Sequence, residues 1–209
     1  MGVDDRINDL EMAKKRDHKI MITDDTIGKV PYIEYKGIQK EQYAILQEFS
    51  KEVLRISKDE NESNEVAITY NMDILSASGE VSREGYYGIA LGTEHSVDPE
   101  EDTTSYHILN GTADCVVVIL HNHPSLSKLS LSDVQFLLQY RTMKMIVAVT
   151  NLGAVSYLVK SDNYDRTRAI SLFNDAYKMD AEAKNLKEKQ EAADYFLNRC
   201  QEAGLVFDY

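Results

Sequence analysis

The chain has 209 residues, of which 43% are hydrophobic and 28% are charged, and its formal net charge is -12 at pH 7. This length suits one substantial core with extensions, and the composition is ordinary for a soluble globular protein. The acidity disfavours nucleic-acid binding by the whole chain, because nonspecific affinity for DNA depends on lysine and arginine neutralising phosphates. We therefore expect no direct DNA binding.

Three features of the sequence indicate the cellular compartment of the protein. No stretch approaches the roughly 18 consecutive apolar residues of a membrane span. Residues 1–5 show no basic region followed by an apolar one, so a classical secretion signal is not indicated. Cys115 and Cys200 are the only cysteines, which is far from a disulfide framework. These features predict a cytoplasmic protein without a membrane partner.

Hydrophobic periodicity predicts a mixed α/β region between two extensions. Charged residues dominate the N-terminal extension, residues 1–30, and helix-forming residues dominate the C-terminal extension, residues 161–209. Between them, residues 31–160 alternate between strand and helix patterns. In chain order we predict a strand at 32–35, a helix at 40–56, strands at 65–70 and 86–91, a helix at 103–109, a strand at 115–120, a helix at 131–140, strands at 146–150 and 155–159, and helical structure over 165–203.

The C-terminal extension carries a stripe of apolar residues at near-helical spacing, including Phe173, Tyr177 and Phe196. We expect this stripe to dock on the core of the central region. The alternative is a surface through which the chain forms a homo-oligomer.

One short segment carries the strongest indication of chemistry, His121-Asn122-His123-Pro124-Ser125. It follows an apolar run typical of a buried strand. Side chains alternate between the two faces of a strand, so His121 and His123 point the same way. Two imidazoles on one face of a strand end can bind one divalent metal ion.

A third ligand is predicted at the start of the next helix. Ser130 and Asp133 have the spacing of a capping box, which by itself is an ordinary structural feature. In the first helical turn, however, the Asp133 carboxylate can reach back toward the strand end. Two histidines and one aspartate leave one position open on a zinc ion, as in catalytic rather than structural sites. His18, His95 and His107 have no partner at a ligand-like spacing, so we do not expect them to be ligands.

These residues resemble the JAMM (MPN-plus) metalloprotease family, and in particular its RadC-like bacterial branch. The family pattern is a glutamate at the start of an early strand, then His-x-His-Pro, then Ser-x-x-Asp. Glu65 matches the first element, and Gly92–Val97 resembles a Gly-Thr-x-x-Ser stretch of RadC-like chains. The resemblance covers roughly residues 38–160. It implies a JAB/MPN-type, cytidine-deaminase-like fold, with a mixed sheet flanked by helices.

The resemblance also implies an activity. Zinc held by His121, His123 and Asp133 would hydrolyse a peptide bond or a lysine isopeptide bond in a protein substrate. Glu65 would be the general base, and Ser130 would donate a hydrogen bond to the oxyanion.

The chain departs from the family pattern in one loop, and one assignment stays open. Residues 124–129 give six positions before Ser130, one fewer than the family usually has. A metal-binding but non-hydrolytic module is therefore a second hypothesis. A third is a DNA-repair or mobile-element role, which RadC-like proteins carry as a historical label. Glu80 and Glu84 also precede a predicted strand, but Glu65 alone lies between a helix and an apolar strand.

Overall fold

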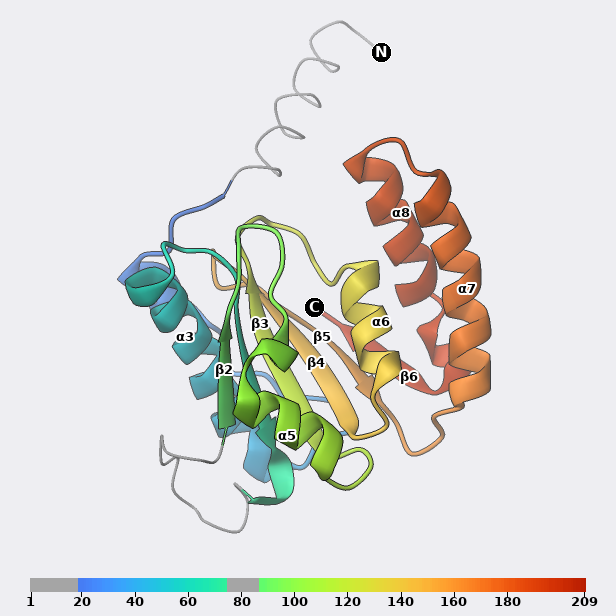
Figure 1. Cartoon of the computed structure of the whole chain (residues 1–209), viewed down its shortest axis with the longest axis horizontal. Coiled ribbons are helices and arrows are strands. Elements are labelled where there is room, and N and C mark those ends of the chain that lie inside the picture. Colours follow the sequence, from blue (N-terminus) through green and yellow to red (C-terminus); the bar gives the residue numbers. More distant parts are fainter. Residues whose placement is uncertain (1–18, 75–86) are drawn as a thin grey trace, which may run out of the picture.

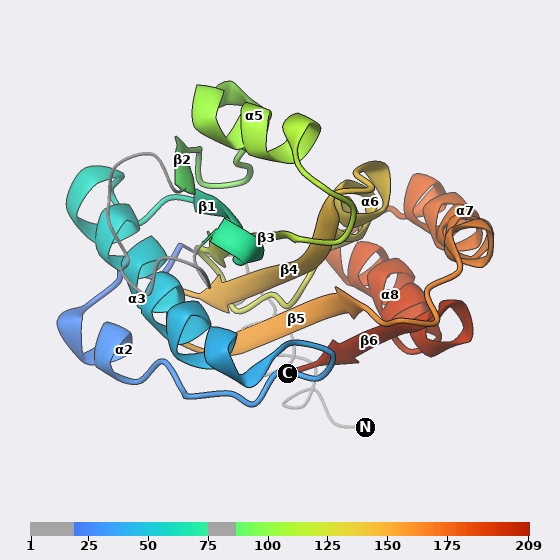
Figure 2. The same cartoon turned by 90° about the horizontal axis from the view of Figure 1, so that it is seen from below.

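A six-stranded mixed sheet organises the residues that the structure describes, 19–74 and 87–209 (Figures 1 and 2). The structure is a computed structural model. The strand order is β2-β1-β3-β4-β5-β6, and β3 and β4 are the neighbours that run parallel. Helices cover both faces of this sheet. The predicted α/β class, with a mixed sheet between helices, is therefore confirmed.

Most elements lie close to the predicted ranges, but the helix at 24–28 and the strand at 205–208 have no predicted counterpart. The strands are β1 (Val66–Asn71), β2 (Tyr87–Leu91), β3 (Val117–His123), β4 (Met143–Thr150), β5 (Val155–Lys160) and β6 (Leu205–Asp208). The helices are α2 (Asp24–Gly28), α3 (Tyr43–Glu60), α5 (Thr103–Gly111), α6 (Leu131–Gln139), α7 (Arg166–Glu182) and α8 (Leu186–Leu197), with 3₁₀ turns η1 (Lys40–Gln42), η2 (Pro99–Glu101) and η3 (Cys200–Ala203).

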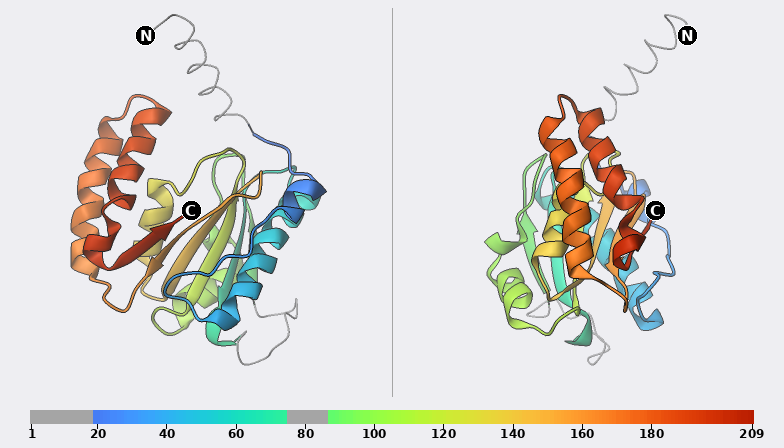
Figure 3. Two further views of the ribbon diagram at one scale, coloured as in Figure 1. Left: turned by 180° about the vertical axis from the view of Figure 1, so that it is seen from behind. Right: turned by 90° about the vertical axis from the view of Figure 1, so that its right-hand side faces the viewer.

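The two faces of the sheet bury separate apolar clusters, because side chains alternate along each strand. In β3, Val117 and Ile119 belong to the cluster beneath α5, α6, α7 and α8, which we call the α6 face. Val118 and Leu120 belong to the cluster beneath α2 and α3, the α3 face. The helices α7 and α8 form a hairpin beside α6 (Figure 3).

The connection from β3 to β4 positions the candidate site. Parallel strands cannot be joined by a tight turn and need a crossover, which α6 supplies here. The chain leaves β3 at His123, crosses the end of the sheet and enters α6 at Leu131. The crossover therefore brings the first turn of α6 back beside the end of β3.

The predicted strand at 32–35 is wrong. The segment has no strand structure, although Tyr35 is buried. Its ring packs edge-on against Tyr157 of β5, with ring centroids 4.9 Å apart, and the neighbouring Lys36 N–H donates to the Tyr157 hydroxyl. The segment thus covers a face of the sheet instead of extending it.

Two further expectations need correction. The strand predicted from Cys115 begins at Val117, and Cys115 is exposed with a left-handed φ of 60°. The C-terminal extension is helical in α7 and α8 as predicted, but its last residues form β6, which pairs with β5. This pairing explains why β5 offers no free edge to residues 32–35.

Over residues 19–74 and 87–209, no helix is both long enough and apolar enough to cross a bilayer. Most of the predicted N-terminal extension, residues 1–18, lies outside the described residues, as do Glu80 and Glu84. The described part of that extension carries α2, whose Ile27 is buried on the α3 face.

Candidate metal centre

Two of the predicted ligands lie side by side at the end of β3. His121 and His123 follow the alternation of Val117 and Ile119, so both point to the α6 face. Both are nearly buried, with 4% and 6% of their surface exposed. Their Nε2 atoms are 2.9 Å apart. The strand therefore delivers two imidazole nitrogens to one point, as the spacing predicted.

The third predicted ligand comes from the start of α6. Asp133 Oδ1 lies 3.1 Å from His121 Nε2, and Asp133 Oδ2 lies 3.5 Å from His123 Nε2. The carboxylate is held by the capping box, in which Ser130 donates to Asp133 Oδ2 through both its main-chain N–H (2.6 Å) and its hydroxyl (2.8 Å). The capping box thus aims Asp133 at the histidines.

The ligand atoms of His121, His123 and Asp133 fit a single metal ion. They lie within 4.8 Å of one another, and the side chains are largely buried. Two atoms bound to a tetrahedral zinc ion lie about 3.3 Å apart when each bond is roughly 2.0–2.1 Å. His121 Nε2 lies 2.9 Å from His123 Nε2 and 3.1 Å from Asp133 Oδ1, and both distances are close to that value. The group can therefore bind a metal ion.

The loop after β3 fixes the orientation of one ligand. His123 Nδ1 lies 3.0 Å from the main-chain oxygen of Ser127. A carbonyl only accepts, so Nδ1 carries the proton, and Nε2 of the neutral ring presents its lone pair to the site. No sequence pattern indicates this contact, because the main-chain oxygen of any residue type can make it.

Burial and the charges of neighbouring side chains together set the pKa values of His123 and Asp133. Burial opposes the charged form of His123, but the hydrogen bond and charge of Asp133, with the charge of Glu65, outweigh it and raise the pKa of His123 to about 9. Burial would likewise raise the pKa of Asp133, yet the two histidines hold it well below its usual range. In the metal-free protein a proton therefore occupies the place between these side chains, and a metal ion must compete with it.

Glu65 lies beside this group without belonging to it. Its main chain joins β1 to the end of β2: its N–H donates to the oxygen of Thr93 (2.9 Å), and its own oxygen accepts from the N–H of Gly92 (2.8 Å). The Gly-Thr-x-x-Ser stretch is thus packed against the predicted base. A side chain on Gly92 would collide with the main-chain oxygen of Ser96, so this close turn requires glycine there.

The surroundings of Glu65 suit a proton acceptor. Ala67 faces the α6 face and pairs with His121, so continuing the alternation by two residues turns Glu65 toward the ligands. Burial raises the pKa of Glu65, and the nearby charges of His121 and His123 partly offset this rise. A carboxyl group with a raised pKa is a better base near neutral pH.

Ser130 has a defined partner that bears on its predicted role. Its hydroxyl accepts from the N–H of Asp133 (3.2 Å) and donates its single proton to Asp133 Oδ2. To donate to an oxyanion the hydroxyl must turn away from Asp133. The geometry gives Ser130 an orienting role, while the oxyanion role stays a prediction.

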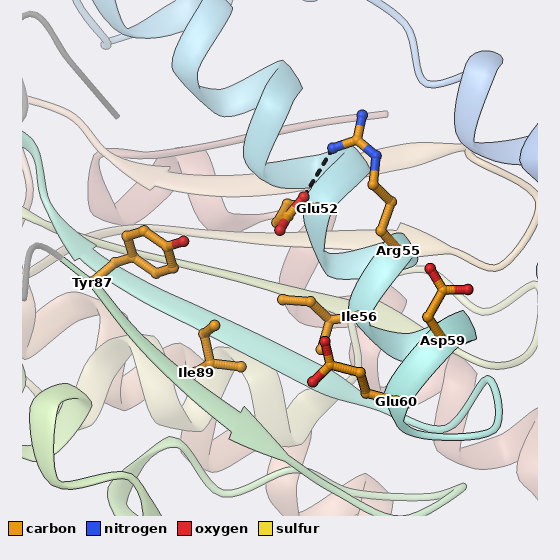
Figure 4. A pocket seen from close by; sticks show the side chains of 7 residues that line it. All are labelled: Glu52, Arg55, Ile56, Asp59, Glu60, Tyr87 and Ile89. Atoms are coloured by element: carbon orange, nitrogen blue, oxygen red, sulfur yellow. Dashed lines mark hydrogen bonds and ion pairs between the residues drawn. The ribbon is translucent and has the colours of Figure 1, made fainter. Parts of the chain in front are cut away.

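A separate hollow lies on the opposite face of the sheet (Figure 4). It has a volume of about 250 Å³ and lies between α3 and β2, and Glu52 and Arg55, both on α3, form an ion pair of 2.9 Å beside it. Its lining residues are Glu52, Arg55, Ile56, Asp59, Glu60, Tyr87 and Ile89. None of them is a candidate site residue, so this hollow and the metal centre are distinct.

Comparison of the chain with protein-family models, with curated proteins and with solved structures found no match.

Proposed function

We propose that the protein is a zinc-dependent metallopeptidase or isopeptidase of the JAMM type. The observation that carries this proposal is the convergence of two histidines and one aspartate beside a partly buried glutamate. Three protein ligands leave an open position on zinc, which distinguishes a catalytic from a structural site. Metal-assisted hydrolysis needs at least a metal ion with an open position and a neighbouring base, and these residues can provide both.

The arrangement of the elements supports a JAB/MPN-type fold. A long helix, α3, precedes β1, whose first residue follows Glu65. The histidine pair ends the central strand β3, and the aspartate opens the crossover helix α6. The family pattern needs the same order of glutamate, histidine pair and aspartate along the chain.

A zinc ion bound by these ligands would supply Lewis-acid activation of water and of the scissile carbonyl. Within the chain, Glu65 would take the proton from the attacking water and deliver it to the leaving amine. Asp133 would remain ionised, since the histidines keep its pKa low. The capping box would keep Asp133 in place while the proton moves.

The deciding experiment separates the base from the ligands. Glu65→Gln keeps the size of the side chain but cannot accept a proton. We expect it to retain zinc and to lower turnover of a lysine-isopeptide or dipeptide substrate by roughly 10²-fold or more. The His121→Ala, His123→Ala double variant should lose both zinc and turnover. Zinc is measured by elemental analysis and turnover by release of the free amine.

Glu80→Gln and Glu84→Gln are the matched controls, because both glutamates also precede a strand in the sequence. Both variants should keep full activity. An inactive Glu84→Gln variant beside a fully active Glu65→Gln variant would move the base to another segment. Wild-type turnover in all these variants would show that the hydrolysis comes from a different site.

One observation favours a second candidate, a metal-binding module without hydrolytic activity. The only hydroxyl proton of Ser130 is used by Asp133, so no side-chain donor of this motif is free for an oxyanion. In a hydrolase, Ser130→Ala should lower kcat by about 10²-fold while most zinc is retained. In a non-hydrolytic module the wild type binds zinc, neither the lysine-isopeptide nor the dipeptide substrate is cleaved, and Ser130→Ala only weakens zinc binding.

A further inference from the structure

Asn122 lies between the two histidine ligands but points to the opposite face of the sheet. Its side chain is fully buried at the junction of β1, β3 and the end of α3. Its oxygen accepts from the N–H of Val66 at 2.7 Å. Its amide nitrogen donates to the Ser57 hydroxyl (3.1 Å), the Asn64 oxygen (3.1 Å) and Asn151 Oδ1 (2.8 Å). The amide nitrogen has two hydrogens for these three acceptors, so one N–H is shared, and both polar atoms of the side chain are hydrogen-bonded.

Two of these partners flank the predicted base. Asn64 and Val66 are the residues immediately before and after Glu65, and Asn122 holds the carbonyl of one and the N–H of the other. Ser57 strengthens this link, because its hydroxyl donates to the same Asn64 oxygen at 2.5 Å. The main chain on both sides of Glu65 is therefore tied to the residue that separates the two ligands.

The main-chain ladder between β1 and β3 does not provide this link, and the hydrogen bonds of Glu65 itself run to Thr93, Gly92 and Asn61 rather than to β3. Pairing between β1 and β3 ends at Ala67 opposite His121, two residues short of Glu65. The turn that leads into Glu65 has left-handed φ angles at Glu62 (51°) and Ser63 (62°), a conformation that costs free energy in residues other than glycine. A turn with such unfavourable φ angles keeps its conformation only because contacts with the surrounding structure hold it.

We propose that Asn122 is a positioning residue that sets the location of Glu65 relative to the metal ligands. This inference rests on the proposed function in giving Glu65 the role of base. The ligands themselves do not need the amide, because β3 is paired on both sides and Asp133 is held by the capping box. Loss of Asn122 should therefore displace the base and leave the metal in place. A displacement on the order of 1 Å can cost about 10²-fold in rate.

Thr142 provides a control for the loss of a buried hydrogen bond. Its side chain is buried, and its hydroxyl donates to the main-chain oxygen of Leu109 at 2.6 Å. It precedes β4 at the end of the sheet away from the two histidines. A general loss of stability would affect Asn122→Leu and Thr142→Val alike, whereas positioning of Glu65 would affect only the first.

The test compares the two variants by zinc affinity, by kcat and KM, and by a distance measurement that needs no turnover. Zinc affinity is measured by competition with a chromophoric chelator. In the cobalt-loaded protein, the paramagnetic relaxation of the labelled Glu65 carboxyl carbon reports its distance from the metal. For Asn122→Leu we expect zinc affinity within a few-fold of wild type, altered Glu65 relaxation, unchanged KM and a kcat roughly 10²-fold lower. For Thr142→Val we expect wild-type relaxation and kcat within a few-fold of wild type.

Equal losses of kcat in the two variants, or unchanged Glu65 relaxation in Asn122→Leu, would overturn the inference. If Asn122→Leu does not fold, Asn122→Thr and Ser57→Ala weaken the same link more mildly and should shift the relaxation in the same direction. If the wild type shows no turnover, the proposed hydrolysis fails. The relaxation measurement then still decides whether Asn122 positions Glu65.

Discussion

Two buried basic side chains at opposite ends of the sheet respond to burial in opposite ways. His123 lies at the end of β3 and Lys160 at the far end of β5, with 6% and 2% of their surface exposed. The pKa of His123 is raised to about 9, against a desolvation that would lower it. The carboxylates of Asp133 and Glu65 cause this reversal, because they favour the protonated ring.

No carboxylate balances the burial of Lys160 to the same extent. Its ammonium group donates to the oxygen of Tyr140 at 2.8 Å and lies 5.2 Å from the centre of the Tyr164 ring. Burial lowers the pKa of Lys160 to about 8, and the positive charges of Arg166 and Lys144 act in the same direction. A carbonyl and a ring are enough to accommodate the ammonium group but not to offset its desolvation.

The comparison shows what distinguishes a candidate metal centre from a buried charge that only packs. In both places the burial penalty has the same sign. At the candidate metal centre, the carboxylates of Asp133 and Glu65 lie beside the histidines. Their negative charge can stabilise either a proton or a metal cation. At Lys160 the cation is the side chain itself, and little negative charge lies near it to stabilise a second cation.

Removing the negative charge of Asp133 should abolish the difference between His123 and Lys160, and it has the largest effect that we expect. In Asp133→Asn a neutral amide replaces the ionised ligand, so zinc affinity should fall on the order of 10²-fold or more. The pKa of His123 in the metal-free variant should fall toward or below its ordinary value, since its main hydrogen-bond partner loses its charge. Chelator competition measures the first change, and an NMR titration of the ring measures the second.

Asp165→Asn is the control for this substitution. Asp165 caps α7 by accepting from the N–H of Arg168, and asparagine caps a helix equally well. This variant should bind zinc like the wild type. Wild-type zinc affinity in Asp133→Asn would remove Asp133 from the ligand set.

The raised pKa of His123 predicts a pH dependence of stability in the chelator-treated protein. The folded state holds the proton up to about pH 9, whereas the unfolded ring releases it near 6.5. The stabilisation is therefore fully present below pH 6.5 and is lost as the pH rises through 9. A shift of this size corresponds to a decrease of about 3 kcal/mol in the free energy of unfolding. Urea unfolding at pH 6, 7, 8 and 9 measures it.

His123→Gln is the control for the pH dependence, because glutamine does not titrate. Its free energy of unfolding should show a much smaller decrease between pH 6.5 and 9. Saturating zinc should also flatten the wild-type curve, since the metal replaces the proton. Equal slopes in the wild type and in His123→Gln, both without metal, would contradict the assigned pKa shift.

Lys160→Met should have the smallest effect at neutral pH, and it should remove a pH dependence of stability that is opposite in sign to that of His123. Methionine removes the buried charge but also the hydrogen bond to Tyr140, so the free energy of unfolding at pH 7 should change by about 1 kcal/mol or less. The folded pKa of Lys160 is lowered from 10.5 to about 8, so its contribution to stability rises with pH between these values. Urea unfolding of the zinc-saturated protein, in which the contribution of His123 is flattened, should show a rise between pH 8 and 9.5 that the variant lacks. An identical slope in the variant would place the ammonium group in contact with solvent.

The sequence by itself indicated most of the elements and the three residues that the structure brings together at the candidate metal centre. Period-two alternation placed His121 and His123 on one face of a strand, and capping-box spacing placed Asp133 in the first turn of a helix. Both patterns are local, since they depend on the geometry of one strand and one helical turn. Neither requires knowledge of what lies across the sheet.

Strand pairing was the point at which local patterns failed. Residues 32–35 have the composition of a strand, but a strand also needs a free edge with which to pair. The free edge of β5 is taken by β6, from the other end of the chain. β-propensity describes how well a segment suits a sheet, and the competition for an edge is settled among segments far apart in the sequence.

The tertiary structure alone decided how the site is held together. The sequence shows an asparagine between two histidines, and nothing local distinguishes a solvated Asn122 from a buried one. Its partners Ser57 and Asn151 are 65 and 29 residues away. The distance between Asp133 and the histidines likewise depends on how the crossover helix packs across the end of the sheet. Ligand identity is a property of residue type and spacing, whereas the geometry that makes a site depends on long-range packing that no local pattern encodes.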